Sequence, residues 1–333
     1  MRPVADFDAR KPSVARIYDY LLGGKNNFAA DRDIGDQMLE IAPEIPVMIR
    51  ENKQLLTTAV TWAAEQGISQ FIDLGCGLPT SPSTHETAHL VTPEAKIAYV
   101  DGDPIVISHL SGLPIKDPRI AVVASDAGDF RTALTGVREF LDLSQPACFL
   151  MGSVIHHFEA DEARDLVGEY VSALAPGSYI VMTSGYMPPG PDAERFLTIF
   201  RASTGPAHIH PVEDILSFLG GLEVLPPGVT DARVWEPGAQ TVPDVGPRVL
   251  WMNGVMARVP EINPLPRTDR PFSPAPSASR VRGIRPRAYF PHARGRASQA
   301  PKTGSECAGH DLGSLVSYSD PDDPGSWQAR RGA

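Results

Sequence analysis

Short apolar runs rich in branched residues alternate with amphipathic stretches along the middle of this 333-residue chain. The apolar runs lie at residues 70–74, 96–100, 120–124, 147–151 and 178–182. Between them are stretches with helical periodicity, such as 104–111 and 161–174. Such an alternation predicts an α/β fold in which helices cover both faces of a mostly parallel sheet.

Further predicted elements flank this region on both sides. Residues 12–22, 31–41 and 44–65 have the periodicity of amphipathic helices. Residues 221–225 and 248–256 have strand-like patterns. We therefore expect the helices to precede the sheet and two more strands to complete it.

The composition changes at Val259. The last 75 residues contain 11 Pro and 7 Gly but only 10 Leu, Ile, Val or Phe, too little apolar surface to offset the entropy of ordering. We expect one folded domain over residues 1–258 and a disordered Pro/Arg-rich tail over residues 259–333. Residues 267–302 hold nine basic side chains and one acidic, which suits a solvated linker or contact with an anionic partner.

The net charge of −10 is unevenly distributed, because the tail holds 11 Lys and Arg against 7 Asp and Glu. The folded domain is therefore acidic, and we expect no nucleic-acid partner, since duplex binding needs a concentrated basic face. No segment reaches the ~20 apolar residues of a membrane span, so we expect no membrane partner. Three widely spaced cysteines argue against a disulfide framework and favour a cytoplasmic location. The sequence does not indicate which oligomeric state the protein adopts.

Two glycines directly follow the first predicted strand, in the sequence FIDLGCG at residues 71–77. Gly75 and Gly77 would let the backbone turn tightly and approach a ligand at the carboxyl end of the strand. A dinucleotide fingerprint needs another glycine where this chain has Thr80. The loop therefore favours a nucleoside without a pyrophosphate group.

Acidic residues follow the next two strands. Asp101 is placed to accept both ribose hydroxyls of a nucleoside, with Asp103 close by, and Asp126 is placed to reach an adenine edge. The alternatives are a helix cap before Pro104 for Asp101 or Asp103, and a turn residue for Asp126. S-adenosylmethionine fits such a pocket better than NAD, because it carries adenosine and a sulfonium but no pyrophosphate.

Five blocks carry a family resemblance: SVARIYDYLLGGKNNFAADR at 13–32, QFIDLGCGLPT at 70–80, HE at 85–86, YVDGDP at 99–104 and APGSY at 175–179. In these blocks the chain resembles the actinobacterial S-adenosyl methyltransferase family, formerly a domain of unknown function. The resemblance covers roughly residues 10–258. It implies a class I methyltransferase fold, Rossmann-like, with a seven-stranded sheet whose last strand is antiparallel, and S-adenosylmethionine as cofactor.

The resemblance also implies roles by position. Asp73, Gly75 and Gly77 would line the methionine and sulfonium end of the cofactor, Asp101 would take the ribose, and Asp126 the adenine. In the opening block, Gly23-Gly24 would end a helix, and the polar loop after it would fold over the cofactor as a lid. The lid residues predicted to contact the cofactor are Tyr18, Gly24, Lys25 and Asn27. From the residues alone, a surface helix with a glycine cap is the alternative.

The segment His85-Glu86-Thr87-Ala88-His89 matches the H-E-x-x-H pattern of zinc metallopeptidases. The helix that carries it ends before Pro93, and Thr92 and Ala95 stand where the extended pattern has Gly and His. We therefore expect no metal site. A zinc peptidase stays an alternative, as does a noncatalytic regulatory protein that binds an adenosyl ligand.

Two histidines follow the fourth strand, at the edge where a methyltransferase receives its acceptor. His156 and His157 are candidate catalytic bases, because the pKa of histidine lies near neutrality. Methyl transfer depends largely on positioning, so the alternative is that they shape the pocket or cap a helix. We expect a methyltransferase that acts on a small-molecule acceptor, which the sequence does not identify.

Overall fold

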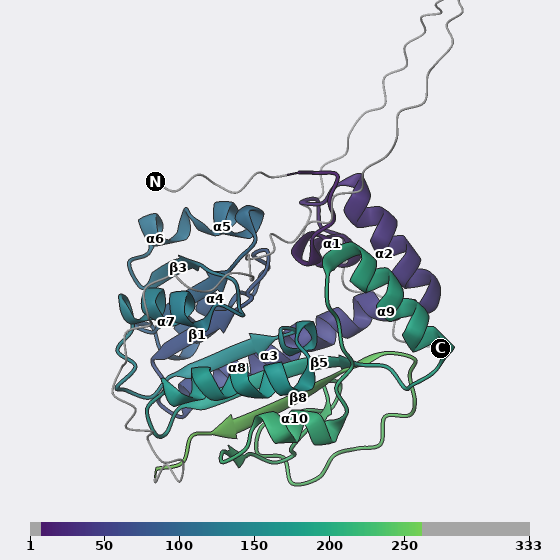
Figure 1. Ribbon diagram of the computed structural model, residues 1–333. Helices are drawn as coiled ribbons and strands as arrows, with labels where there is room; N and C mark the ends of the chain where they lie inside the picture. Colours follow the sequence, from purple (N-terminus) through teal and green to yellow (C-terminus); the bar gives the residue numbers. More distant parts are fainter. Residues whose placement is uncertain (1–7, 262–333) are drawn as a thin grey trace, which may run out of the picture. The chain divides into compact units, whose positions relative to one another are not determined.

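The computed structural model describes residues 8–261 (Figure 1). The predicted tail lies outside the described residues from position 262 onward. Among residues 8–261, no helix combines the length and the apolar character needed to cross a bilayer.

One sheet organises the domain, in the strand order β3-β2-β1-β4-β5-β8-β6, with β7 paired to β8. Strands β1 to β5 are parallel to one another, whereas β8 runs antiparallel to β5. The described strands are β1 Gln70–Leu74, β2 Lys96–Asp101, β3 Ile120–Ala124, β4 Cys148–Gly152, β5 Tyr179–Tyr186, β6 Glu223–Val224, β7 Thr230–Asp231 and β8 Trp251–Arg258. The predicted α/β fold is confirmed, with one two-residue strand, β7, beyond the seven expected.

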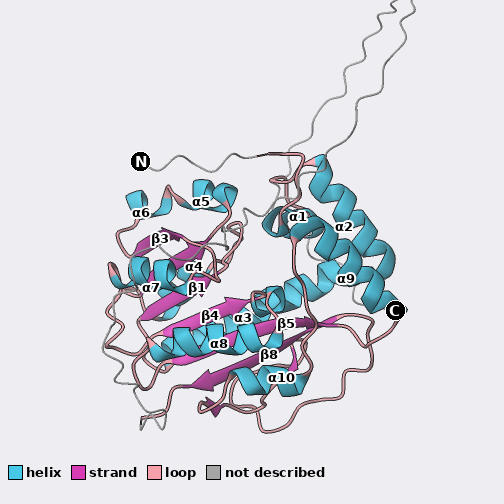
Figure 2. Ribbon diagram, in the orientation of Figure 1, coloured by secondary structure: helices cyan, strands magenta, loops and turns pink. Residues whose placement is uncertain are grey.

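Helices cover both faces of the sheet, as Figure 2 shows. They are α1 Val14–Leu21, α2 Ala29–Ile41, α3 Ile45–Glu65, α4 Thr84–Val91, α5 Pro104–Leu110, α6 Leu113–Lys116, α7 Phe130–Arg138, α8 Ala160–Ser172, α9 Pro191–Thr204 and α10 Val212–Phe218, with a 3-10 turn η1 at Ile155–His157. Alternate strand residues face opposite ways, so Phe71 packs in the layer of α3 to α5 and Ile72 in the layer of α7, α8 and α10.

The last long strand begins later than the sequence pattern predicts, at Trp251 instead of 248. Glu44 explains the delay, because its carboxylate accepts the backbone N–H groups of Val249 and Leu250, each at 3.1 Å. Arg248 pairs with Glu51 at 2.6 Å. A contact with the start of α3 therefore replaces ladder hydrogen bonds at these positions.

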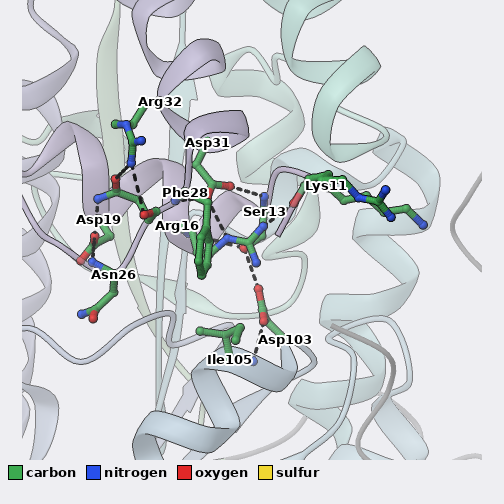
Figure 3. A network of polar contacts seen from close by, with 12 residues as sticks. Lys11, Ser13, Arg16, Asp19, Asn26, Phe28, Asp31, Arg32, Asp103 and Ile105 are labelled. Atoms are coloured by element: carbon green, nitrogen blue, oxygen red, sulfur yellow. Dashed lines mark hydrogen bonds and ion pairs between the residues drawn. The ribbon is translucent and has the colours of Figure 1, made fainter. Parts of the chain in front are cut away.

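Helices α1, α2 and α9 stand together beyond the carboxyl ends of β4 and β5 (Figure 1). A buried ion pair of 2.8 Å joins Arg16 of α1 to Asp31 of α2. Asp31 also accepts the backbone N–H of Ser13 at 3.0 Å, and the Ser13 hydroxyl donates to Asp103 at 2.6 Å (Figure 3). The N-terminal helices are thus fastened to the loop that follows β2.

Candidate functional site

The glycine loop after β1 is held by the carboxylate that ends β2. Gly75 and Gly77 have φ angles of +64° and +67°, a left-handed region that side chains rarely adopt. The Gly77 N–H donates to Asp101 at 2.9 Å, and the Asp103 N–H donates to the other oxygen of Asp101 at 2.8 Å. Burial raises the pKa of the Asp101 carboxyl. Asp101 therefore fixes the loop and retains lone pairs at the edge of the sheet.

Asp103 caps the N-terminus of α5, as the helix-cap alternative expected. One of its oxygens accepts the Ile105 N–H at 2.8 Å, at the start of α5, and the other accepts the Ser13 hydroxyl. Both oxygens are thereby engaged within the protein. Its predicted contact with the cofactor stays a prediction.

Asp126 lies beside Asp101 at the same edge of the sheet, because β3 pairs in parallel with β2. A Cβ on Gly102 would come within 3.2 Å of the Asp126 backbone, so glycine permits this close approach. One Asp126 oxygen accepts the Gly128 N–H at 2.8 Å, as the turn alternative expected. The side chain is exposed, which leaves its other oxygen open to a ligand.

Asp73 and Lys53 line a pocket beneath the glycine loop, which we call the glycine-loop pocket. Its other walls are Gly75 to Thr80, the start of α4, and Gly152 at the end of β4. The Thr84 hydroxyl donates to Asp73 at 2.6 Å. Burial raises the pKa of Asp73 to about 6, opposed by the Thr84 hydrogen bond, and burial lowers the pKa of Lys53. The pocket thus offers an acidic and a basic group in a partly desolvated space.

A second pocket, which we call the apolar pocket, lies among α1, α2, α3, α9 and the ends of β5 and β8. It holds about 600 Å³ of empty space, counted with its open mouth. The lining residues are Tyr18, Leu21, Met38, Ile45, Met48, His156, Gly185, Met187, Phe196, Leu197, Phe200, Ala207, His208, Ile209, Leu250 and Met252. No Asp, Glu, Lys or Arg is among these described residues, so the pocket suits an uncharged ligand.

Ser153 lies between the two pockets. It directly follows Gly152, which lines the glycine-loop pocket. Its hydroxyl oxygen accepts a hydrogen bond of 3.3 Å from the hydroxyl of Tyr18, which lines the apolar pocket. The Asn52 amide donates to the same oxygen at 3.1 Å. Ser153 has a φ angle of 58°, a conformation rare for residues with a side chain and typical of functional positions. A polar boundary therefore separates the charged pocket from the apolar one.

The structure places one of the predicted lid residues at a pocket and the other three away from both pockets. Tyr18 lines the apolar pocket, whereas Gly24, Lys25 and Asn27 line neither pocket. The Asn27 amide donates to Asp19 at 2.8 Å, and a Cβ on Gly24 would collide with the same carboxylate. Lys25 is exposed. Cofactor contacts of these loop residues stay predictions, and Gly24 and Asn27 help to shape the turn after α1.

Both predicted catalytic histidines lie in η1, after β4. His156 lines the apolar pocket, and its buried Nδ1 has no hydrogen-bond partner among the described residues. His157 Nδ1 lies 3.2 Å from the carbonyl oxygen of Pro206. Burial lowers the pKa of both imidazoles, of His156 well below its usual range. His156 is therefore neutral at pH 7, and the same burial makes it a weak base.

The H-E-x-x-H segment lies in α4, where its side chains serve the fold. Glu86 accepts the Ser83 N–H at 2.7 Å in a capping box. His85 Nδ1 lies 2.8 Å from the Tyr99 hydroxyl, and His89 Nε2 donates to the Ala95 carbonyl at 3.0 Å. Within residues 8–261 no group of three or more His, Cys, Asp or Glu is arranged to hold a metal ion. Nothing here supports the peptidase alternative.

The sheet order, the glycine loop after β1 and the acid after β2 define a class I methyltransferase fold. The residues fit S-adenosylmethionine, because the open oxygen of Asp126, the lone pairs of Asp101 and the charges of the glycine-loop pocket match its adenosine and amino-acid ends. A sequence profile described as S-adenosyl methyltransferase matches residues 2–260. The chain belongs to this family, and it is an S-adenosylmethionine-dependent methyltransferase.

Two solved structures are similar to the chain. A candidate methyltransferase from Thermobifida fusca is 38% identical over 78% of this chain and 98% of that protein, with a TM-score of 0.71. A DUF574 family protein from Streptomyces avermitilis is 34% identical over 76% of this chain and 99% of that one, with a TM-score of 0.70. No curated protein matches the sequence.

The sequence analysis did not identify several residues that the structure brings to the site. Lys53 and Asn52 lie in a long amphipathic helix, where nothing in the local pattern separates them from surface and core positions. The left-handed conformation of Ser153 has no sequence signal, since such backbone is normally indicated by glycine. The apolar lining comes from elements far apart in the chain, and each of its residues could equally belong to the core.

Proposed function

We propose that this methyltransferase binds S-adenosylmethionine along the glycine loop and transfers its methyl group to a small molecule in the apolar pocket. The observation that carries this proposal is the position of Ser153. It follows Gly152 of the glycine-loop pocket and bonds to Tyr18 of the apolar pocket. A methyl group leaving one pocket at this boundary enters the other.

Each end of the cofactor is assigned to a group with matching chemistry. Asp101 binds the ribose hydroxyls, Asp126 the adenine edge, and Gly75 with Gly77 gives the backbone room for close approach. Asp73 faces the amino-acid end. When bound, S-adenosylmethionine supplies a methyl group that its positive sulfur makes electrophilic.

The lining of the apolar pocket supports an uncharged and largely apolar acceptor. Met48, Met187 and Phe196 offer adaptable apolar contacts to a small molecule. A charged acceptor would lose its hydration there without finding an opposite charge.

His156 is the group to which we assign the orientation of the acceptor. It lines the apolar pocket, its Nδ1 has no partner, and burial lowers its pKa so that the imidazole is neutral. A neutral imidazole can accept a hydrogen bond from the attacking hydroxyl or amine and orient it, and the proton lost on methylation passes to solvent, because burial makes this imidazole a weak base. His157, whose Nδ1 lies against Pro206, positions η1 beside the pocket.

A metabolite-extract screen tests the proposed function. The purified protein is incubated with S-adenosylmethionine and fractionated extract, and release of S-adenosylhomocysteine is measured. We expect release with uncharged, organic-soluble fractions. Release only with peptide or protein fractions would contradict a small-molecule acceptor, and cofactor binding without release in any fraction would indicate the noncatalytic alternative.

A cytoplasmic location is part of the same proposal. Cys76 and Cys148, the described cysteines, are free thiols. Burial raises the pKa of the Cys76 thiol, so it stays protonated within the glycine loop. Free thiols in the folded domain suit a reducing compartment.

A further inference from the structure

Lys53 of α3 lines the glycine-loop pocket, where no other Lys or Arg is among the described lining residues. The same helix supplies Ile45 and Met48 to the apolar pocket. Helix α3 therefore borders both pockets and contributes one basic side chain, Lys53, on the cofactor side of the boundary at Ser153. This side chain places a positive charge on the cofactor side.

Lys53 is half-buried and has neither a hydrogen bond nor an ion pair within the part of the chain that the structure describes. It interacts with Asp73 through space only, with no hydrogen bond between the two side chains. Asp73 uses one oxygen for the Thr84 hydroxyl, which leaves the other open. Two opposite charges thus line one pocket without neutralising each other directly.

The amino-acid end of S-adenosylmethionine carries the complementary pair of charges, an ammonium and a carboxylate on one carbon. We propose that Lys53 binds the carboxylate of this amino-acid end while Asp73 binds its ammonium, so that the two residues select cofactors that carry an intact amino acid. The inference rests on the proposed cofactor site at the glycine loop. It adds a binding residue outside every sequence pattern identified above.

A solvated surface lysine is the competing explanation, and the surroundings of Lys53 argue against it. Leu56, Thr57 and Val60 of the same helix line the pocket around it. Burial lowers the pKa of its ammonium, so the charge lies where water stabilises it poorly. A bound carboxylate would supply the missing stabilisation as a charge-assisted hydrogen bond.

Two ligands that differ only at the amino-acid end test the assignment. S-adenosylhomocysteine has the full end, whereas 5′-methylthioadenosine keeps the adenosine and the sulfur and lacks the amino acid. Dissociation constants of both are measured by calorimetry on the full chain for wild type, Lys53→Met and Arg50→Met. Arg50 is an exposed residue of the same helix outside both pockets, so its variant controls for lost charge.

We expect Lys53→Met to weaken S-adenosylhomocysteine roughly 10- to 100-fold, the range for a lost charge-assisted hydrogen bond. Binding of 5′-methylthioadenosine should change less than about twofold, and Lys53→Arg should restore part of the loss. Arg50→Met should affect neither ligand. Equal losses for both ligands, or no loss, would overturn the inference.

Asp101→Asn separates failure of this inference from failure of the proposed site. Both ligands carry ribose, so this variant should weaken both. If Asp101→Asn weakens both and Lys53→Met weakens neither, the cofactor site stands and the role of Lys53 is wrong. If Asp101→Asn changes neither ligand, the proposed cofactor site itself is wrong.

Discussion

The two pockets of the domain differ in how the chain builds them. The glycine-loop pocket takes most of its wall from residues 73–87, and it contains charged side chains. The apolar pocket takes its wall from helices and strand ends between Tyr18 and Met252, and none of its described lining residues is Asp, Glu, Lys or Arg. The comparison teaches that the cofactor site is encoded locally, whereas the acceptor site depends on how distant elements pack.

The largest effect should follow from placing a charge in the apolar pocket. We expect Leu197→Lys to reduce S-adenosylhomocysteine release with an active extract by at least about 100-fold, because an ammonium in the wall of the pocket displaces or repels an apolar acceptor. Binding of S-adenosylhomocysteine, measured by calorimetry, should stay near wild type.

Thr198→Lys is the matched control, since Thr198 is the exposed neighbour on α9. It should keep full activity. Loss of cofactor binding in a folded Leu197→Lys variant would show that the two pockets are not separate sites.

The charge of the glycine-loop pocket predicts a pH effect of intermediate size. Asp73 has a pKa of about 6, so it loses its charge as the pH falls below that value. Affinity for S-adenosylhomocysteine should then drop by about tenfold between pH 7 and pH 5, because the ligand ammonium loses its partner.

The Asp73→Asn variant identifies the group responsible, since Asp101, Lys53, His85 and Tyr99 also face this loop. It should bind more weakly at pH 7 and show a flat profile between pH 5 and 7. A profile as steep as that of wild type would assign the titration to Asp101 or His85.

A smaller effect should come from the boundary between the pockets. Tyr18→Phe removes the hydroxyl that reaches Ser153 and keeps the ring that lines the apolar pocket. We expect kcat to fall by roughly fivefold, the cost of one neutral hydrogen bond, with little change in cofactor affinity. An unchanged kcat would show that the Tyr18 hydroxyl does not contribute to methyl transfer.

The smallest effect should follow from His89→Gln. The His89 ring donates to the Ala95 carbonyl and lies edge-on to the His85 ring, and a glutamine amide can donate to the same carbonyl oxygen. Cofactor affinity should stay within about twofold of wild type. Stoichiometric zinc in the purified protein, lost in this variant, would restore the peptidase alternative.

Sequence reasoning was most successful for residues that lie at the carboxyl ends of strands. The parallel order, the glycine loop and the edge position of Asp101 and Asp126 were predicted because a strand-loop-helix unit is read within a few residues. The cap made by Asp103 was an open alternative; the cap is present in the structure, and the predicted contact of Asp103 with the cofactor stays a prediction.

The rest could not be predicted, for physical reasons that differ from residue to residue. Lys53 fits ordinary helix periodicity, so the sequence does not indicate that it lines a pocket. Its position at the glycine-loop pocket follows from how α3 packs beside the sheet. Ser153 adopts a left-handed conformation that glycine, and not serine, normally indicates in a sequence. The start of β8 depends on Glu44, more than 200 residues earlier, which takes the hydrogen bonds of Val249 and Leu250.

A crystal structure of the protein with S-adenosylhomocysteine tests the central claim most directly. The account predicts that the sulfur lies beside Gly152 and Ser153 and faces Tyr18 across the boundary, with the ribose at Asp101 and the amino-acid end between Asp73 and Lys53. A sulfur that faces away from the apolar pocket, or an amino-acid end outside the glycine-loop pocket, would contradict it.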